Sequence, residues 1–131
     1  NSAEKRIRLF NLLDQKRISI ATVKSKFSII SENSFIGIGT VVMHGVIVNS
    51  GSFVGVNCIL NTNSLVEHDV KIGNHCHIST GVIINGGVEI GNECFVGSGC
   101  ILREGVKIGN KSIISAGQIV MKDVPENCVI K

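Results

Sequence analysis

Aliphatic residues recur at every sixth position through most of the chain. From Ile30 to Val120, every sixth residue is Ile, Leu or Val. The residue four places after each of them is small or β-branched, with Gln118 as the single exception. A period kept this strictly over such a length indicates a repeat architecture.

A longer period of eighteen residues lies on top of the shorter one. The segments VGVNC, IGNHC, IGNEC and IGNKS begin at Val54, Ile72, Ile90 and Ile108. Three hexads therefore make one coil. A hexad of extended chain is about 20 Å long, so three of them close a triangle, and stacked triangles pair their backbones as parallel strands. The pattern predicts a triangular β-solenoid in which each coil buries its apolar edge against its neighbours.

Glycines follow many of the inward aliphatic positions. We expect them to occupy corners with a positive φ, which costs little energy for a residue without a Cβ. The glycines at this position include Gly37, Gly55, Gly73, Gly91 and Gly109.

The segment before the repeat has a different pattern. In NSAEKRIRLFNLLDQKR, apolar residues at i, i+3 and i+6 predict a short amphipathic helix over residues 1–17, which Asn1 or Ser2 could cap. The following ISIATV is interpreted as an extended lead-in strand. The expected organisation is a helix and lead-in strand at 1–29, the solenoid at 30–125 and a tail at 126–131.

Composition narrows the classes of function. The 131 residues are enough for one domain, and 44% of them are hydrophobic. The net charge of +3 is scattered and the chain has no Trp or Tyr, which argues against a nucleic-acid surface. No stretch approaches the roughly 20 apolar residues of a membrane span.

The five cysteines favour a reducing, cytoplasmic location. Their number is odd and no C-x-x-C spacing is present, which suits free thiols better than a disulfide framework. Four of them occupy the small inward position of the repeat and are interpreted as core residues: Cys58, Cys76, Cys94 and Cys100.

The outward positions form three vertical columns. The residue before each inward aliphatic points outward, and two of the resulting columns are apolar while the third becomes polar. Apolar stripes of this extent normally mark an interface. Two such faces on one prism predict a closed ring, of which a trimer is the simplest. The columns are Ile47, Leu65, Ile83, Ile101 and Ile119; Val41, Ile59, His77, Phe95 and Ile113; and Phe35, Phe53, Lys71, Glu89 and Lys107.

Three of the four histidines lie in the stretch SLVEHDVKIGNHCHISTG, residues 64–81. In this stretch, Asp69 can orient one nitrogen of the outward His68 and raise the basicity of the ring. One coil above His68 is Gly86, whose backbone amide could stabilise a developing oxyanion. A general base and a backbone amide donor above it are sufficient for acyl transfer when the acceptor attacks the acyl donor directly.

The other histidines have less specific signals. His77 is the single polar residue in an apolar outward column, which fits either a site residue or an interface histidine satisfied by one hydrogen bond. It is half a coil from His68, so the two could share a site only across a subunit boundary. We expect His75 to lie in solvent without a role, and His44 to lie on the surface in a column near the proposed site.

No metal site is expected. Zinc needs three or four converging ligands, and ligands stacked in this repeat would be separated by eighteen or thirty-six residues. No histidine pair has either separation.

The repeat resembles the hexapeptide-repeat acyltransferases, which are trimeric and whose fold is a left-handed parallel β-helix. The all-β class and triangular solenoid follow from periodicity, whereas the handedness comes from the resemblance. The segment NTNSLVEHDVKIGNHCHISTG is similar to the active-site coil of the sialic acid O-acetyltransferase and UDP-4-amino-sugar N-acetyltransferase family.

This resemblance implies roles for six residues. His68 would be the general base and Asp69 its orienting partner. The acetyl-CoA contacts would be made by His77, Gly86, Ser98 and Ala116. The implied protein is a homotrimer with active sites between subunits, and the implied activity is acetyl-CoA-dependent N-acetylation of a nucleotide-activated amino sugar in bacterial surface glycan biosynthesis.

Two other functions remain open, and the chain differs from the usual family sequence at both ends. The chain could instead be an O-acetyltransferase acting on a sialic-acid-like sugar, or a non-catalytic β-helix scaffold. Family members usually begin with a small α/β nucleotide-sugar-binding domain, whereas this chain begins with what resembles its last helix. Many also end with a G-x-P-A-K segment in place of the VPENCVIK found here, so we expect both ends to be incomplete.

Overall fold

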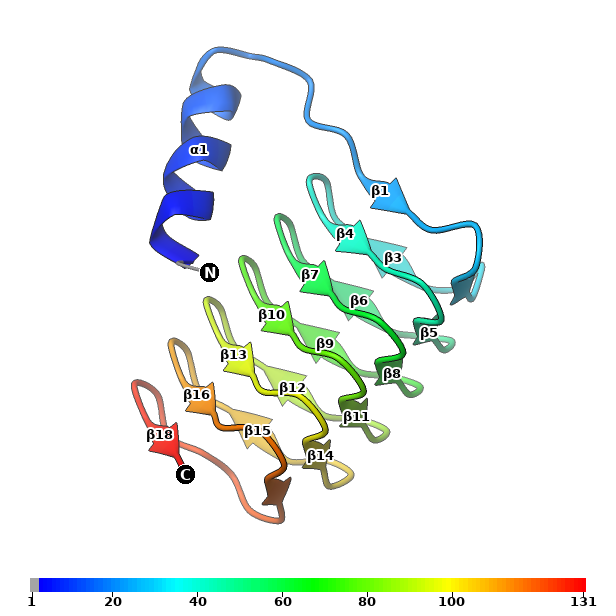
Figure 1. The fold of residues 1–131 in the computed structure, drawn as a ribbon, viewed down its shortest axis with the longest axis vertical. Coiled ribbons are helices and arrows are strands. Elements are labelled where there is room, and N and C mark those ends of the chain that lie inside the picture. Colours follow the sequence, from blue (N-terminus) through cyan, green and yellow to red (C-terminus); the bar gives the residue numbers. More distant parts are fainter. Residues whose placement is uncertain (1–2) are drawn as a thin grey trace.

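The computed structural model describes residues 3–131 as one α-helix followed by a triangular β-solenoid (Figure 1). Helix α1 spans Ala3–Gln15, and the proposed caps Asn1 and Ser2 lie outside the described residues. The chain runs leftward through the faint strands at the back, rightward through the strands in front, and descends in this view with each coil (Figure 1). A residue described as one coil above another is one coil nearer the C-terminus, and therefore lower in Figure 1. This winding is left-handed, so the expected fold class is confirmed.

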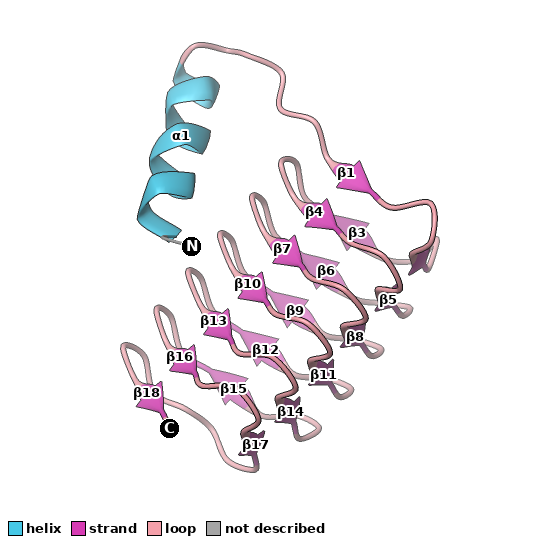
Figure 2. Ribbon diagram, in the orientation of Figure 1, coloured by secondary structure: helices cyan, strands magenta, loops and turns pink. Residues whose placement is uncertain are grey.

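Each side of the triangle is a parallel sheet built from strands of two residues, separated by turns at the corners (Figure 2). Sheet A contains β1 (Val23–Lys24), β4 (Val41–Val42), β7 (Ile59–Leu60), β10 (His77–Ile78), β13 (Phe95–Val96), β16 (Ile113–Ile114) and β18 (Val129–Ile130). Sheet B contains β2 (Ile29–Ile30), β5 (Ile47–Val48), β8 (Leu65–Val66), β11 (Ile83–Ile84), β14 (Ile101–Leu102) and β17 (Ile119–Val120). Sheet C contains β3 (Phe35–Ile36), β6 (Phe53–Val54), β9 (Lys71–Ile72), β12 (Glu89–Ile90) and β15 (Lys107–Ile108).

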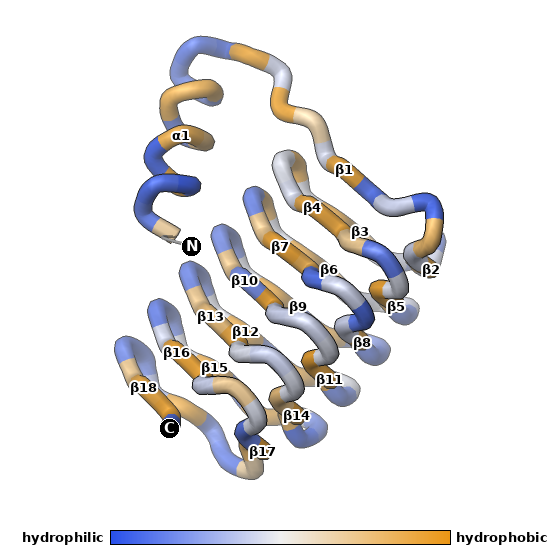
Figure 3. Tube along the Cα trace, viewed as in Figure 1, coloured by the Kyte–Doolittle hydropathy of each residue, from blue (hydrophilic) through white to orange (hydrophobic). Residues whose placement is uncertain are grey.

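The register confirms the three outward columns. Ile83 pairs with Leu65 below and Ile101 above in sheet B. His77 pairs with Ile59 and Phe95 in sheet A, while the outward residues of sheet C change from phenylalanine to charged residues along the chain. Figure 3 shows hydrophobic strands and hydrophilic turns at many corners. The paired strands extend from β1 to β18, beyond the range expected for the repeat at both ends.

The inward positions form one continuous core. Val54, Leu60, Val66, Ile72 and the equivalent residues of the following coils are almost completely buried. Burying an aliphatic side chain of this size contributes roughly 1.5–3 kcal/mol. Because each coil presents such side chains on all three sides, the stack of coils provides most of the hydrophobic stabilisation.

Most polar atoms at the small inward position hydrogen-bond to the backbone, although the buried Ser64 hydroxyl has no partner among the described residues. The Cys76 thiol donates to the carbonyl of Gly91 at 3.0 Å, and the Thr40 hydroxyl donates to the carbonyl of Gly55 at 2.9 Å. The four cysteines expected in the core are buried and free, as predicted. Hydrogen bonding of this kind is what buried polar groups require.

The glycines after the aliphatic positions have a different role from the one expected. Gly73 does not have a positive φ, and a Cβ added there would lie 2.7 Å from the backbone carbon of Gly91 in the next coil. Gly37, Gly55, Gly91 and Gly109 are equally crowded. These residues must be glycine because adjacent coils approach too closely for a side chain. The prediction of positive φ was therefore wrong.

The left-handed backbone conformation occurs two residues later in the same corner. It is adopted by Gly39, Asn57, His75, Glu93 and Lys111. Most of these are not glycine, so hydrogen bonds and packing around the corner stabilise a conformation that L-residues adopt uncommonly.

Helix α1 is anchored to this corner. The Arg6 guanidinium donates from Nη2 to the carbonyl of His75 at 2.6 Å and from Nε to that of Asn57 at 3.2 Å. Phe10 contacts the His75 ring edge-on, with 5.6 Å between the ring centroids. None of the helices described in residues 3–131 is both long and apolar enough to cross a bilayer.

Candidate active site

His68 lies at the corner between sheets B and C, two residues after β8. Its Nδ1–H donates to Oδ2 of Asp69 at 2.9 Å, and both side chains are exposed. Asp69 adopts a φ of 59°, which aspartate tolerates better than most residues. The hydrogen bond raises the pKa of His68 and assigns the proton to Nδ1, so Nε2 of the neutral ring is a free acceptor.

Gly86 lies one coil above His68, as the repeat predicts. The amide of Gly87 donates to the carbonyl of His68 at 3.0 Å, which sets this register. A Cβ added at Gly86 would lie 2.7 Å from both Cε1 and Nε2 of His68. The imidazole therefore leans over Gly86 and occupies the space that any other residue would need. The Gly86 amide has no hydrogen-bond acceptor within the described part of the chain.

His77 lies on a different side of the prism. It is on β10 of sheet A, and its side chain is 7% exposed. Phe95 contacts the ring edge-on, with 5.3 Å between centroids. Burial lowers the pKa of His77, so the imidazole is neutral near pH 7, and its Nε2 has no partner among the described residues.

Ser98 and Ala116 are exposed at the corner between sheets A and B. Backbone hydrogen bonds connect their coils, because the amide of Gly117 donates to the carbonyl of Ser98 at 2.9 Å. The amide of Gly99 similarly donates to the carbonyl of Thr80 at 3.0 Å. Within one chain, this corner does not meet the corner that carries His68 and Gly86.

His75 was expected in solvent, and this expectation was wrong. The ring is half-buried beneath α1, and its Nδ1 is 2.8 Å from the side-chain nitrogen of Asn57. Burial lowers the pKa of His75. The sequence pattern missed this contact because it depends on how α1 folds back over a corner. His44 is exposed as expected, although its Nδ1 is 2.6 Å from the Ser25 hydroxyl.

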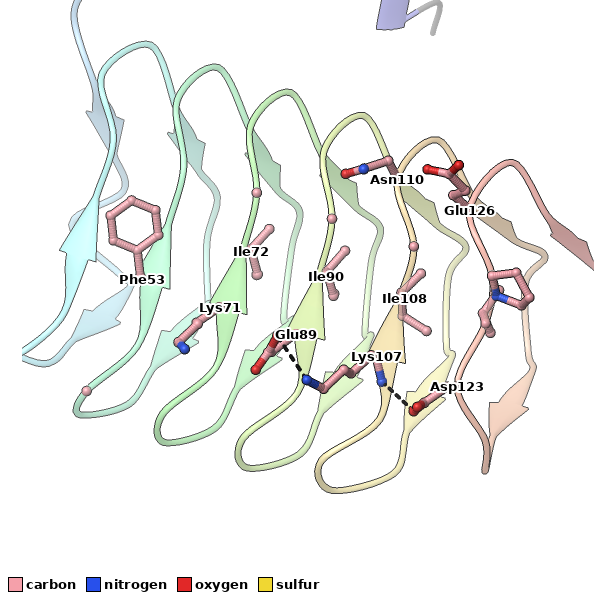
Figure 4. A pocket seen from close by; sticks show the side chains of 16 residues that line it. Phe53, Lys71, Ile72, Glu89, Ile90, Lys107, Ile108, Asn110, Asp123 and Glu126 are labelled. Atoms are coloured by element: carbon pink, nitrogen blue, oxygen red, sulfur yellow. Dashed lines mark hydrogen bonds and ion pairs between the residues drawn. The ribbon is translucent and has the colours of Figure 1, made fainter.

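His68 and Gly86 line one cavity, whereas a larger hollow contains neither of them. A cavity of about 430 Å³ is lined by His68, Gly86, Arg103 and Glu104, among others. A larger hollow of about 790 Å³ lies over sheet C (Figure 4). Figure 4 shows that Lys107 in this hollow is bound to Glu89, an ion pair of 3.6 Å, and that its backbone amide donates to Asp123. The smaller cavity contains the groups suited to acid–base chemistry.

No cluster of three or more His, Cys, Asp or Glu side chains within residues 3–131 is arranged to hold a metal ion. The chemistry that the arrangement supports is proton transfer at His68, beside a backbone amide donor.

Comparisons with known proteins identify the repeat. Residues 87–122 match the model of the family described as the hexapeptide repeat of succinyl-transferase. PerB from Caulobacter crescentus, solved in complex with CoA and GDP-perosamine, is 31% identical and superposes with a TM-score of 0.95 over 97% of this chain. The resemblance to the hexapeptide-repeat acetyltransferases is confirmed.

Two further structures agree with this result. The acetyltransferase domain of PglB from Neisseria gonorrhoeae FA1090 is 26% identical, with a TM-score of 0.95 over 97% of this chain. WeeI from Acinetobacter baumannii AYE is 25% identical, with a TM-score of 0.93 over 98% of this chain. The alignments cover 61%, 62% and 64% of the PerB, PglB and WeeI chains, respectively. No curated protein sequence matches the chain.

Proposed function

We propose that this protein is an acetyl-CoA-dependent N-acetyltransferase that acts on a nucleotide-activated amino sugar. The observation that carries the proposal is the arrangement of His68 between Asp69 and Gly86, in which one imidazole nitrogen is oriented and the other is free. Similarity to PerB, which was solved with CoA and GDP-perosamine, supports the choice of both substrates.

Direct transfer accounts for each group at the site. Nε2 of His68 accepts a proton from the acceptor's ammonium group, which leaves a neutral amine, and Asp69 stabilises the resulting imidazolium. The amine then attacks the thioester carbonyl, and the Gly86 amide stabilises the negative charge that develops on its oxygen. The tetrahedral intermediate collapses and expels the CoA thiolate, which takes up the second proton lost from nitrogen.

The corner between sheets A and B provides a suitable surface for the pantetheine arm. Nothing lies within 4 Å of a Cβ added at Gly81, Gly99 or Gly117, so the backbone there is open to a ligand. We assign Ser98 and Ala116 to this surface. We also assign His77 to the cofactor side, because its buried Nε2 has no hydrogen-bond partner among the described residues.

A homotrimer is part of the proposal. His68 and Gly86 occupy one corner of the prism, whereas the assigned cofactor surface occupies another. In a trimer, the His68 corner of one subunit meets the cofactor surface of its neighbour. The outward apolar columns of sheets A and B support this assembly.

The test measures release of CoA thiol from acetyl-CoA with two acceptors, GDP-perosamine and free sialic acid. We expect turnover with the 4-amino nucleotide sugar and none with sialic acid, because an amine is the better nucleophile once deprotonated. Preference for sialic acid would establish O-acetylation. Tight binding of acetyl-CoA without turnover of either acceptor would contradict the assigned acceptor class.

A further inference from the structure

The space above His68 is bounded by a second ionisable side chain. Glu104 is two coils above His68, with Gly86 between them, and lines the same cavity. The amide of Gly105 donates to the carbonyl of Gly86 at 3.0 Å, so the three corners are stacked in register. Because Gly86 has no side chain, its corner places no side-chain atoms between His68 and Glu104.

Most polar side chains around this cavity are already hydrogen-bonded within the chain. These bonds join Asn49 to Glu67 at 2.9 Å, Asn85 to the Leu102 carbonyl at 2.8 Å, and Arg103 to the Met121 carbonyl at 3.2 Å. Within residues 3–131, the Glu104 carboxylate and Nε2 of His68 have no such partner. Both are acceptors when His68 is neutral, and both residues line the same cavity.

We propose that Glu104 binds the acceptor's protonated amine and thereby selects an amine over a hydroxyl. The inference rests on the proposed function and assigns the group that recognises the reacting nitrogen. An ammonium offers three N–H donors, so it can donate to Nε2 of His68 and to the Glu104 carboxylate together. A hydroxyl has a single hydrogen and can satisfy only one of these acceptors.

The proton balance is consistent with this binding mode. The bound ammonium transfers one proton to Nε2 of His68, which leaves a neutral amine still donating a hydrogen bond to Glu104. This amine attacks the thioester carbonyl and becomes positively charged in the tetrahedral intermediate. The departing thiolate takes a second proton, the third remains on the amide, and the imidazolium releases its proton to water.

Electrostatics agree with the geometry. The hydrogen bond to Asp69 is the largest cause of the raised pKa of His68, and the negative charge of Glu104 adds a smaller contribution. Glu104 is therefore close enough to act on the ring and on a cation bound beside it.

The test compares Glu104→Gln with Glu32→Gln. Glu32 occupies the same corner column as His68, two coils below it and on the side away from Gly86. Its substitution therefore removes the same charge at the same number of coils from His68, but outside the cavity. The substrate is the amino sugar that the wild type acetylates. The second compound has a hydroxyl in place of the amine, and its affinity is measured as competitive inhibition. We expect Glu104→Gln to raise KM for the amine about 10- to 100-fold and to leave inhibition by the hydroxyl compound and KM for acetyl-CoA unchanged.

Glu32→Gln should behave as wild type, and Glu104→Asp should recover part of the affinity for the amine. An unchanged KM for the amine in Glu104→Gln, with wild-type turnover intact, would overturn this inference and leave the proposed function standing. Equal weakening of the amine and the hydroxyl compound would overturn it as well, since Glu104 would then not discriminate between them. A wild type without amine acetylation would overturn the proposed function, and this inference with it.

Discussion

Asp69 and Gly86 act on His68 from two sides. Asp69 holds the proton on Nδ1 through a hydrogen bond of 2.9 Å, while Gly86 leaves room for the ring to extend upward. Asp69 thus determines which imidazole nitrogen carries the proton, and Gly86 determines where the ring can lie. Neither function requires burial, because the side chains of His68 and Asp69 are 61% and 72% exposed in the single chain.

Removing the imidazole tests its role as general base. We expect His68→Ala to lower kcat by about 10²- to 10⁴-fold, the usual contribution of general base catalysis. Affinity for acetyl-CoA should change little, because the ring contacts the acceptor. Asp69→Asn should lower kcat in the same direction but less. Steady-state kinetics on assembled protein provide the measurement, and a near-normal kcat for His68→Ala would exclude it as the base.

The pH dependence follows from the raised pKa of His68. The neutral ring is the base, so kcat/KM should fall as pH decreases through a pKa above the ordinary value of 6.5. Asp69→Asn removes the main cause of the increase and should move this acidic limb to lower pH. An acidic limb at the same pH in both proteins would show that another group titrates.

Gly86→Ala should disturb the site more than its neighbour Gly87→Ala. The added Cβ at Gly86 would collide with the His68 ring, whereas nothing lies within 4 Å of a Cβ at Gly87. Gly87 has a φ of 66°, so its substitution should cost stability without moving the imidazole. We expect kcat to fall strongly only in Gly86→Ala. Equal kcat values in the two variants, with thermal unfolding as the control, would contradict the close packing of ring and glycine.

At the scale of elements, the corners impose stricter requirements than the strands. A strand of two residues needs one inward aliphatic side chain, and several residue types satisfy this need. The corner between sheets C and A also needs a residue without a Cβ at Gly73 and its equivalents, since adjacent backbones meet there. Asn92 uses the same space, because its Oδ1 accepts the amide of Asn74 at 2.8 Å.

Gly73→Ala tests this requirement. Its Cβ would lie 2.7 Å from the backbone of Gly91, which cannot move without separating two coils. We expect destabilisation of about 3 kcal/mol, the upper end of the usual cost of overpacking. Gly81→Ala, at an open corner with a φ of 67°, should cost only about 1–2 kcal/mol for the left-handed backbone. Denaturant unfolding compares the two, and a larger loss for Gly81→Ala would refute the explanation.

At the scale of the whole molecule, the distribution of outward residues predicts self-association. Sheets A and B carry mostly apolar residues outward, and several of these are exposed in the single chain, including Ile113 at 43% and Ile119 at 64%. Sheet C instead presents charged residues, namely Lys71, Glu89 and Lys107, after Phe35 and Phe53 in its first two coils. A prism with two apolar sides and one polar side fits the proposed trimer.

Ile83→Asp should dissociate this trimer, because the substitution would bury an unpaired charge between subunits. Lys71→Asp, which exchanges one charge for another on sheet C, should leave it intact. Light scattering distinguishes the assembly from a single chain of 14.0 kDa. A wild type that stays monomeric at micromolar concentration would contradict the trimer and the shared site that depends on it.

The periodic part of the structure was predictable from the sequence because local rules determine it. The alternation of side chains along a strand, combined with a spacing of eighteen residues, sets both the register and the direction of each side chain. Ile83, His77 and Lys71 therefore lie on the expected faces, and Gly86 lies above His68. The handedness did not follow from the period, since both hands satisfy the same spacing.

The tertiary structure alone decided the features that depend on contacts between distant residues. The position of His75 under α1 arises from Arg6 and Phe10, which are far from it in sequence. The reason for glycine at Gly73 lies in the next coil, so the local pattern suggested positive φ where crowding is the cause. The availability of the Glu104 carboxylate in the cavity that His68 lines depends on the hydrogen bonds of the neighbouring coils, because a side chain is free only when nothing packed around it binds it.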